Sequence, residues 1–479
     1  MKENITMTTT EKIKYATISA SPVKSFFVSM LTRDITLEDT ILDLLDNCVD
    51  GIIRSKKSDR DKPYKGYRAE IDFNADLFTI SDNCGGIPWK MHNYAFRMGK
   101  PTNTPVDAAG TVGVYGIGMK RAIFKIGKYC LITTQNGPDR YEIEIATPWF
   151  TDEKDWNLTP KYTRKPSTED GTTIVIGALN DGIKEQFDKD RDKFTGELID
   201  IISTNYAYII NKGFQVKING QTVKPRDTKL IFDINPLGDK APAIQPYIFK
   251  TKTDDGVEVF LAVGFTRPIP TQSEIESEQE QKRFSSEDAG WTIICNDRTV
   301  VFCDRTELTG WGDAGIPRFH TQFIAISGIV EFKSDDASKL PTTTTKRGIN
   351  ANLPIYAQIK NKMREGMRQF TDYTNKWKGK ADEVKKQMQD GNLLSLNEIK
   401  EFSQKVDFNR TIRSFPAGEQ YKPTLPMPKK IEPTKRRITF VKDLSEINRI
   451  AEYLDTPYSD PSEIGVKCFD IVLEEAKQE

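Results

Sequence analysis

Residues 41–51 combine an apolar stripe with a row of acidic side chains at helical spacing. With the helical period of about 3.6 residues, Asp43, Asp46, Asn47 and Asp50 fall on one face, at positions i, i+3, i+4 and i+7. Leucines, a valine and an isoleucine fall on another face, so we expect a helix with one side in a protein core. The acidic face is either an ordinary solvated surface or part of a functional site, and residues farther along the chain must decide between these two interpretations.

The composition predicts a multidomain protein with no membrane partner. At 479 residues, of which 37% are hydrophobic and 29% charged, the chain is long enough for two or three domains of about 150 residues each. Lysine plus arginine and aspartate plus glutamate both number 69, so any contact with DNA would have to be local. No run approaches the roughly 18 apolar residues of a membrane span, and no signal-peptide core is present. We therefore expect a cytoplasmic location.

The six cysteines lack paired ligand spacing. In a reducing compartment they are best explained as small buried hydrophobic residues. Neither a zinc site nor a disulfide framework is expected.

Two strand-like runs, residues 67–73 and 77–81, predict a hairpin whose second strand leads directly into Asp82, Gly85 and Gly86. Paired glycines beside an aspartate at a strand end suit a turn in which the backbone approaches a ligand. An ordinary turn has the same composition, so this segment alone leaves both interpretations open.

A polar, turn-rich segment at residues 101–110 has the composition of a mobile loop and leads into a second glycine-rich block. A glycine-rich turn that opens a helix presents backbone N–H groups to phosphate, although glycines also serve as plain helix-entry turns. The block is not a Walker loop, because no Gly-Lys-Ser/Thr sequence follows. Its glycines and the lysine that adds a positive charge are Gly113, Gly116, Gly118 and Lys120.

Further strands at residues 129–134, 141–146 and 171–177 complete the pattern of the N-terminal part. The order of elements is helix, hairpin, loop, helix, hairpin and strand. This order predicts an α+β fold, a sandwich with helices on one face of a mixed or antiparallel sheet.

Four separated blocks, residues 43–51, 82–86, 113–118 and 171–172, stand in the order and approximate spacing found in the GHKL ATPases. This family includes DNA gyrase, MutL and histidine kinases. The first three blocks resemble its E-x-x-D-N-x-x-D, D-x-G-x-G and G-x-x-G-x-G motifs, and the third is most similar to the MORC members. The resemblance implies a GHKL ATP-binding domain at residues 1–185, with ATP and Mg²⁺ as its ligands.

The resemblance also implies roles for single residues. Asn47 would bind the magnesium ion, since an amide oxygen is a hard ligand. Asp82 would accept a hydrogen bond from the adenine amino group, with Thr172 supporting it and Gly86 leaving room for the base. The phosphates would be surrounded by Gly113, Gly116, Gly118 and Lys120.

Two positions depart from the family pattern. The catalytic glutamate, which orients the attacking water, is Asp43 here and is one methylene shorter. A displacement of about 1 Å can reduce a rate on the order of 10²-fold, so either the helix lies closer to the phosphate or hydrolysis is slow. Cys84 replaces the first glycine of the second motif, and if that position requires a positive φ the turn must be built differently.

Residues 186–380 resemble the transducer domain that follows the ATP-binding domain in gyrase, MutL and MORC proteins. The segment contains a long amphipathic stretch, an Asn-Gly hairpin, several strands and an acidic stretch at 273–287 that we interpret as a loop. In those families a transducer lysine reaches the γ-phosphate, and Lys346, in the threonine-rich loop 341–348, is the candidate. A plain solvent-exposed lysine is the alternative.

Residues 381–479 fall outside the resemblance. They predict a helical extension, a proline-rich linker and a small helical C-terminal tail that serves as a docking element. The linker ends in a basic cluster at residues 429–437, which either contacts phosphates or is a solvated linker.

Taken together, the motifs predict a Mg-dependent, slowly hydrolysing ATPase that forms a nucleotide-dependent homodimer and acts as a clamp on DNA or a protein client. The alternative is a nucleotide-sensing binding module with little turnover. A histidine kinase is disfavoured, because neither His92 nor His320 falls in a dimerising helical hairpin. A topoisomerase is not expected, because no catalytic tyrosine domain can be assigned after Lys380.

Overall fold

The computed structural model describes residues 23–55, 62–99, 116–163, 169–233, 242–281, 287–343, 346–389, 391–405, 408–411, 416–428 and 437–478. The chain divides into two compact units, Met1–Met427 and Pro428–Glu479. Both helices and strands build the first unit, so the predicted mixed α+β class is confirmed. None of the described helices combines the length and the apolarity that a bilayer span requires. Loop 101–110, Gly113 and most of the basic cluster at 429–437 lie outside the described residues.

Helix α2 (Leu37–Ser55) contains the acidic stretch and confirms the helix predicted there. It begins where the Asp39 N–H donates a hydrogen bond to the Thr36 hydroxyl over 3.1 Å, an N-terminal cap. Its apolar side chains are buried against the first sheet, including Ile41, Leu45 and Val49. This burial fixes which face of α2 is turned away from the sheet.

The first sheet has eight strands in the order β5-β4-β3-β6-β2-β1-β7-β8. All neighbours are antiparallel except β1 and β7, which pair in parallel. The predicted hairpins are present as β1–β2 and β3–β4. The strand bounds are β1 (Arg68–Phe73), β2 (Phe78–Asp82), β3 (Gly127–Asn136), β4 (Asp139–Ile145), β5 (Lys161–Thr163), β6 (Gly171–Leu179), β7 (Gln215–Ile218) and β8 (Gln221–Thr222).

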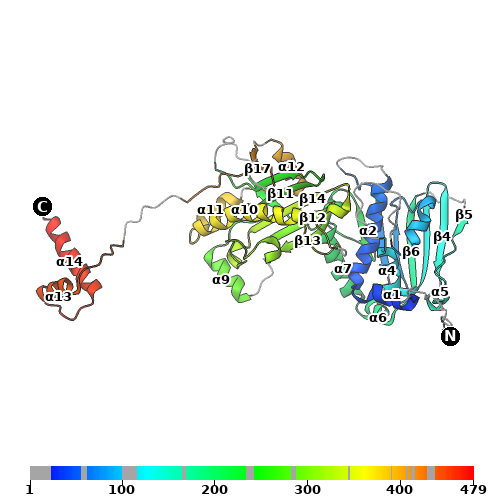
Figure 1. Cartoon of the computed structure of the whole chain (residues 1–479), viewed down its shortest axis with the longest axis horizontal. Helices are drawn as coiled ribbons and strands as arrows, with labels where there is room; N and C mark the ends of the chain where they lie inside the picture. The colour runs from blue at the N-terminus through cyan, green and yellow to red at the C-terminus, as the bar shows by residue number, and fades with distance from the viewer. Residues whose placement is uncertain are drawn as a thin grey trace, which may run out of the picture. The chain divides into compact units, whose positions relative to one another are not determined.

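Helices gather beside this sheet and share one apolar core with it (Figure 1). Helix α2 packs against α4, and α1 packs against α4 in turn. Shorter helical segments follow the turn after β2 and the end of β4. The helix bounds are α1 (Lys24–Arg33), η1 (Trp89–Met91), α3 (His92–Phe96), α4 (Gly118–Ile126), α5 (Thr147–Thr151), α6 (Asp181–Lys189) and α7 (Arg191–Asn205).

The first sheet extends beyond residue 185, where the sequence analysis divides the first two domains. Helix α7 returns the chain across the sheet, so that β7 pairs in parallel with β1. The apolar core of the first sheet accordingly includes Phe214, Val216 and Val223. A parallel strand added through a helical crossover has no local sequence signal that separates it from the start of a new domain.

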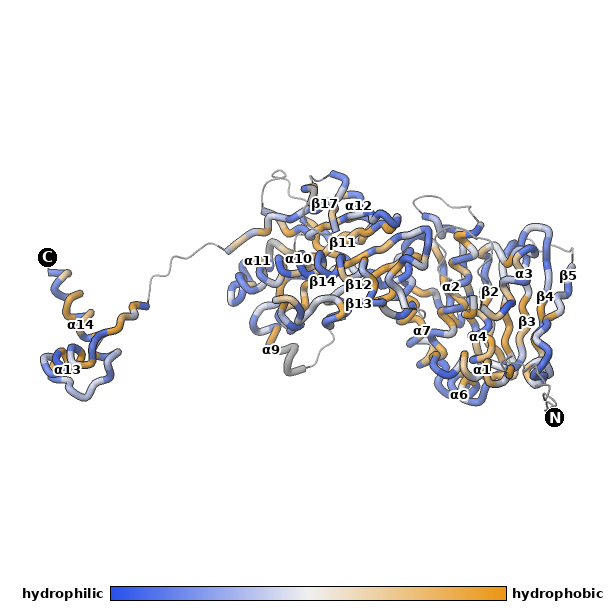
Figure 2. The backbone as a smooth tube through the Cα atoms, in the orientation of Figure 1, coloured by the Kyte–Doolittle hydropathy of each residue, from blue (hydrophilic) through white to orange (hydrophobic). Residues whose placement is uncertain are grey.

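A second sheet of seven strands, in the order β13-β12-β14-β11-β10-β17-β16, follows in the same unit. Strands β11 and β12 are buried almost throughout and consist largely of apolar residues (Figure 2). A separate pair, β9 and β15, lies beside it. The bounds are β9 (Leu230–Phe232), β10 (Tyr247–Lys252), β11 (Glu258–Phe265), β12 (Gly290–Cys295), β13 (Arg298–Asp304), β14 (Ile326–Lys333), β15 (Asn392–Leu394), β16 (Asn409–Thr411) and β17 (Gly418–Tyr421).

Helices cover both faces of the second sheet. On β11, Val259, Leu261 and Val263 share a core with α10 (Pro354–Lys376), whereas Phe260 and Ala262 share one with α8 and α12. Residues 381–427, which the sequence analysis places with the C-terminal extension, therefore complete this part of the fold. The remaining helical bounds are α8 (Ala207–Asn211), α9 (Gln272–Gln281), η3 (Glu307–Thr309), η4 (Thr321–Phe323), η5 (Ala337–Lys339), α11 (Ala381–Gln389) and α12 (Leu396–Ser403).

The interpretation of the acidic stretch 273–287 as a loop is wrong for its first part, because Gln272–Gln281 form helix α9. A capping box starts this helix. The Thr271 N–H donates to the Glu274 carboxylate over 2.8 Å, and the Glu274 N–H donates to the Thr271 hydroxyl over 3.3 Å. The backbone N–H groups of Thr271 and Glu274 thus both have acceptors at the helix start, which favours a helix despite the repeated negative charges.

The second unit contains the two amphipathic helices that the sequence predicts, α13 (Leu444–Tyr453) and α14 (Pro461–Ala476). Ala451 and Ile464 are their buried residues. Asp460 caps α14 by accepting a hydrogen bond from the Ser462 N–H over 2.9 Å.

Candidate functional site

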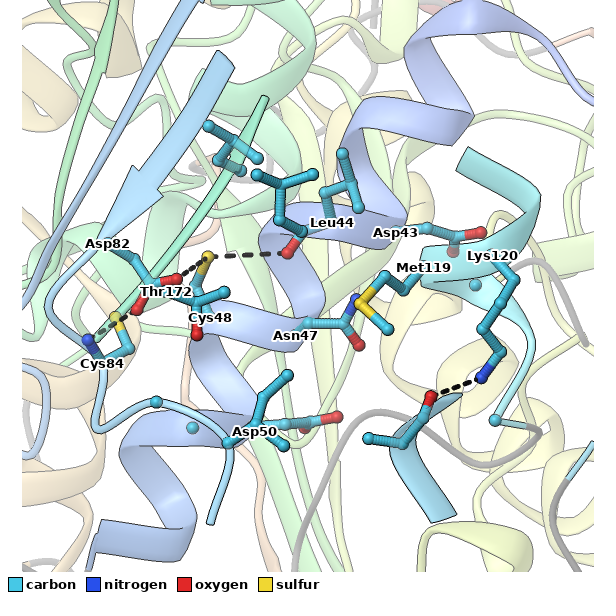
Figure 3. Close-up of a pocket in the computed structure, with 18 of the residues that line it drawn as sticks. Asp43, Leu44, Asn47, Cys48, Asp50, Asp82, Cys84, Met119, Lys120 and Thr172 are labelled. Atoms are coloured by element: carbon cyan, nitrogen blue, oxygen red, sulfur yellow. Dashed lines mark hydrogen bonds between the residues drawn. The ribbon is translucent and has the colours of Figure 1, made fainter. Parts of the chain in front are cut away.

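A cavity of about 430 Å³ lies in the first unit, between α2, the start of α4 and the ends of β2 and β6. This volume lies in the range of small-molecule sites. Figure 3 shows the side chains of α2 facing the lysine of α4 across the cavity. Of the ten residues singled out from the sequence, Gly113 lies outside the described residues and the others all line this cavity: Asp43, Asn47, Asp82, Gly86, Gly116, Gly118, Lys120, Thr172 and Lys346.

Asp82 occupies the inner end of the cavity, where β2 ends. One carboxylate oxygen accepts the Cys84 N–H over 2.7 Å (Figure 3). The other lies 3.5 Å from the Cys48 sulfur, which is equally far from the Leu44 carbonyl oxygen, so the two acceptors share one thiol proton. Burial raises the pKa of Asp82 to about 6, although these hydrogen bonds and one from the Thr172 backbone oppose the shift. Asp82 is therefore an ionised acceptor at neutral pH, and the Cys84 N–H occupies one of its oxygens.

The turn after Asp82 accommodates Cys84 without strain at that residue. The positive φ angles are carried by the two following glycines, +93° at Gly85 and +66° at Gly86. A Cβ atom on Gly86 would lie 1.9 Å from the Gln135 carbonyl oxygen, so the neighbouring strand excludes any side chain there. The close backbone packing explains why this position is glycine, independently of any ligand.

Lys120, in the first turn of α4, is buried at the opposite end of the cavity. Its ammonium group donates to the Ala95 carbonyl oxygen over 2.8 Å (Figure 3). Burial lowers its pKa to about 8. The ammonium group still carries its proton at neutral pH, beside the N-terminus of a helix, where the backbone dipole also favours an anion.

Asp43 lies between α2 and the start of α4. Its carboxylate forms an ion pair with Arg121, and burial raises its pKa while Arg121 partly offsets the shift. A Cβ atom on Gly118 would lie 3.3 Å from the Asp43 Cβ atom. Because Gly118 has no side chain, the first turn of α4 lies directly against Asp43.

Asn47 is exposed, although its neighbours on both sides in α2 are buried. Its side chain lies between Asp43 and Asp50 along the wall of the cavity (Figure 3). Among the described residues there is no group of three His, Cys, Asp or Glu side chains able to hold a metal ion. One amide oxygen fits a magnesium ion only if phosphate oxygens and waters supply the other ligands, as magnesium commonly prefers.

Asp46, to which the sequence motifs assign no role, accepts three side-chain hydrogen bonds. Its carboxylate accepts hydrogen bonds from Tyr206 over 2.6 Å, Lys346 over 2.9 Å and Arg298 over 3.1 Å. Although burial opposes ionisation, Lys346 and Arg298 lower the pKa of Asp46 to about 2. Asp46 thus joins the first sheet's main helix to the second sheet.

Lys346 therefore reaches the cavity from the second half of the unit, but its partner is Asp46. The next residue, Arg347, forms an ion pair with Asp39, two turns earlier on α2. The expectation that Lys346 contacts a phosphate stays a prediction. Its sequence-level alternative, a plain exposed lysine, is wrong, because the side chain is only 13% exposed.

Comparisons with known proteins do not assign this chain to a family. The sequence matches no protein-family model, and a search of curated proteins finds no significant match.

Proposed function

We propose that the cavity binds ATP with magnesium and that the chain is a slowly hydrolysing ATPase of the GHKL type. The observation that carries the proposal is the polarity of the cavity. An ionised acceptor, Asp82, lies at one end and Lys120 at the opposite end (Figure 3), and Arg121 and Lys346 also line the cavity beside Asp43 and Asp46. A ligand with an amine-bearing base at one end and a chain of phosphates at the other matches this distribution.

The Asp82 end favours adenine over guanine. A carboxylate accepts a hydrogen bond from the adenine amino group, whereas the corresponding guanine oxygen would be repelled. Ile80, Ile174 and Ile87 provide apolar surface around this end for the faces of a flat ring. The base would thus be selected by one acceptor inside a mainly apolar pocket.

The opposite end would hold the phosphates. Lys120 contributes a positive charge, and the first turn of α4 contributes backbone N–H groups at Gly118 and Met119. Asn47 would hold magnesium by its amide oxygen. When bound, the ion would supply positive charge to the phosphate oxygens.

Asp43 is the residue that would promote hydrolysis. Its carboxylate would orient a water molecule whose oxygen attacks the γ-phosphorus. The bond from that phosphorus to the bridging oxygen breaks, ADP leaves with the bonding electrons, and the water proton passes to the carboxylate. The close approach of Gly118 to Asp43 supports the idea that a shorter carboxylate suffices, because α4 would bring the phosphates near it.

The second sheet and α10 would act as the transducer-like part of a nucleotide-driven clamp on a DNA or protein client, with a homodimer forming in the ATP state. This part of the proposal is supported by the Asp46 contacts, through which Lys346 and Arg298 connect the second sheet to the cavity. The alternative function is a nucleotide sensor with little turnover. It is favoured by the ion pair that engages Asp43 with Arg121.

The nucleotide proposal is tested by replacing Asp82 with asparagine. Because the Cys84 N–H donates to one Asp82 oxygen, an asparagine would turn its amide oxygen towards that N–H. Its NH₂ group would then lie where the other Asp82 oxygen would accept from the adenine amine. We expect the affinity for ATP to fall by about 10- to 100-fold, measured by calorimetry. The matched control, Asp76→Asn, makes the same charge change at the exposed turn between β1 and β2 and should bind normally. Unchanged affinity in Asp82→Asn would remove the site assignment.

The same site predicts a pH dependence. With the pKa of Asp82 at about 6, protonation below this pH replaces an acceptor by an O–H donor. Adenosine binding should therefore weaken as the pH falls through about 6, and adenosine is the suitable ligand because it carries no titrating phosphate. Asp82→Asn should show no such step.

Replacing Lys346 with alanine tests the clamp. If γ-phosphate competes with Asp46 for Lys346, ATP and ADP must stabilise different arrangements of the loop that carries it. We expect a non-hydrolysable ATP analogue to compact or dimerise the unmutated protein in small-angle scattering, and ADP to leave it unchanged. Lys346→Ala should bind ADP but lose the analogue-specific change, whereas Lys339→Ala, an exposed lysine of the same segment, should keep it. Identical profiles with both nucleotides would contradict the clamp.

A further inference from the structure

Arg121 lies in the first turn of α4 and lines the same cavity. The only ion pair that the described residues give its guanidinium group is with Asp43. Its Nε–H is buried and, within the described part of the chain, has no hydrogen-bond partner. No motif in the sequence analysis assigns this residue a role.

The number and geometry of the N–H donors of arginine indicate what the unpartnered Nε–H could bind. A guanidinium group has five N–H donors in a fixed planar fork, which matches two oxygens of a phosphate or carboxylate. Asp43 engages one end of the fork through Nη2, and a buried N–H without a partner is destabilising. A purely structural ion pair would not require an unsatisfied donor beside a cavity, so the geometry leaves capacity for an anionic ligand.

The position of the fork indicates which part of a ligand it would contact. Arg121 touches Asp43, the residue proposed to orient water at the γ-phosphorus, and it follows Lys120 in the same helical turn. Asp43 lies across the cavity from Asp82 (Figure 3), so a group in contact with that carboxylate lies on the same side as Asp43. With adenine at Asp82, the β-phosphate would lie farther from Arg121 than the terminal phosphate.

We propose that Arg121 binds the terminal phosphate of ATP, and that Asp43 is its partner only while that phosphate is absent. The inference rests on the proposed nucleotide function and adds a residue that distinguishes ATP from ADP. When the terminal phosphate takes over the guanidinium group, Asp43 loses the cation that holds it. The carboxylate is then released to bind the attacking water, and the arginine remains to stabilise the charge that develops on the phosphoryl oxygens.

This arrangement would link water activation to the arrival of ATP. With ADP or with an empty cavity, the carboxylate stays paired and does not orient water. Asp46 and Lys346 also act on the charge of Asp43, and in the absence of nucleotide they form an ion pair with each other. Arg121 is the cation that pairs directly with Asp43, so its transfer to the phosphate would have the larger effect on this carboxylate.

The test compares ATP with ADP in the full-length chain. Calorimetry with ADP and with a non-hydrolysable ATP analogue gives an affinity ratio for the unmutated protein and for Arg121→Gln. We expect the ratio to fall by about 10- to 100-fold in the variant, through weaker analogue binding, with ADP affinity nearly unchanged. Lys125→Gln removes one positive charge from the last turn of the same helix, away from the cavity, and should leave the ratio as it is.

Arg121→Lys provides the second variant. It keeps the ion pair with Asp43, and hence the fold, but replaces the planar fork with a point charge, so it should give an intermediate ratio. If Arg121→Gln binds ADP and retains the unmutated ratio, the inference about Arg121 is overturned while the nucleotide proposal stands. If the unmutated chain binds neither nucleotide, the nucleotide proposal itself fails.

Discussion

Asp43→Ala is expected to reduce ATP hydrolysis by about 10²- to 10⁴-fold, the usual contribution of a positioned acid–base group. Nucleotide binding should persist, because the carboxylate acts on the attacking water and contributes more to the transition state than to the bound ground state. The structure places Asp43 where this role requires it, against the first turn of α4 and on the wall of the cavity. Removing its charge also releases Arg121, which is expected to favour phosphate binding.

The measurement is phosphate release under single-turnover conditions, with calorimetry on the same preparation to establish that ATP still binds. Asp43→Asn serves as the matched variant, because it keeps the size of the side chain and removes only its basicity. Both variants should show the same loss of rate. Phosphate release by Asp43→Ala at the unmutated rate would show that Asp43 is not the base, and the sensor alternative would then be favoured.

Local sequence patterns were sufficient to predict the elements that surround the cavity. The apolar period of α2, the turn residues after Asp82 and the glycines before α4 each act over fewer than about ten residues, within reach of helix and turn rules. The resemblance to the GHKL family, and not these local patterns, selected the site residues, and it missed others that line the cavity, such as Arg121. The turn at Cys84 shows where such rules are incomplete, because the sequence does not tell which residue takes the positive φ angle, and Gly85 and Gly86 take it here.

Contacts between distant segments could not be predicted in the same way. In the sequence Asp43, Asp46 and Asp50 are equivalent acidic residues on one helical face, yet Asp46 pairs with residues 252 and 300 positions away. Arg298 opens strand β13 and Lys346 follows β14, and neither location has a local signal for a partner on α2. The parallel pairing of β7 with β1 could not be predicted for the same reason, since it depends on the path that α7 takes across the sheet.

The consequence of the Asp46 contacts is that Asp46→Ala should destabilise the first unit by about 3–5 kcal/mol, the typical effect of removing one partner of a buried ion pair. The side chains of Asp46 and Arg298 are only 3% and 2% exposed, so water cannot replace the lost carboxylate. Lys346 and Tyr206 would lose the same acceptor. The variant thus leaves two cations without compensation at the junction of the two sheets.

Tryptophan fluorescence during urea unfolding reports the free energy of unfolding of the first compact unit, because all six tryptophans precede residue 428. Asp188→Ala, an exposed aspartate on α6, is the control and should be nearly neutral. The double variant Asp46→Leu with Arg298→Met should be more stable than Asp46→Ala, since apolar residues can replace a buried pair at little loss. A difference below about 1 kcal/mol between Asp46→Ala and the unmutated protein would place the Asp46 contacts among the weak ion pairs of exposed surfaces.

Because the stabilising contacts of Asp46 require its ionised form, the destabilisation caused by Asp46→Ala depends on pH. The folded pKa of Asp46 is about 2, below its ordinary value of 3.8, so folding favours the ionised form. The stabilising contribution is complete above about pH 4 and is lost as the pH falls towards 2, because protons then bind the unfolded chain first. The free energy of unfolding of the unmutated protein should therefore approach that of Asp46→Ala as the pH is lowered through this range. A difference between the two proteins that stays constant from pH 5 to about pH 2 would mean that Asp46 stabilises the fold by packing and not by its charge.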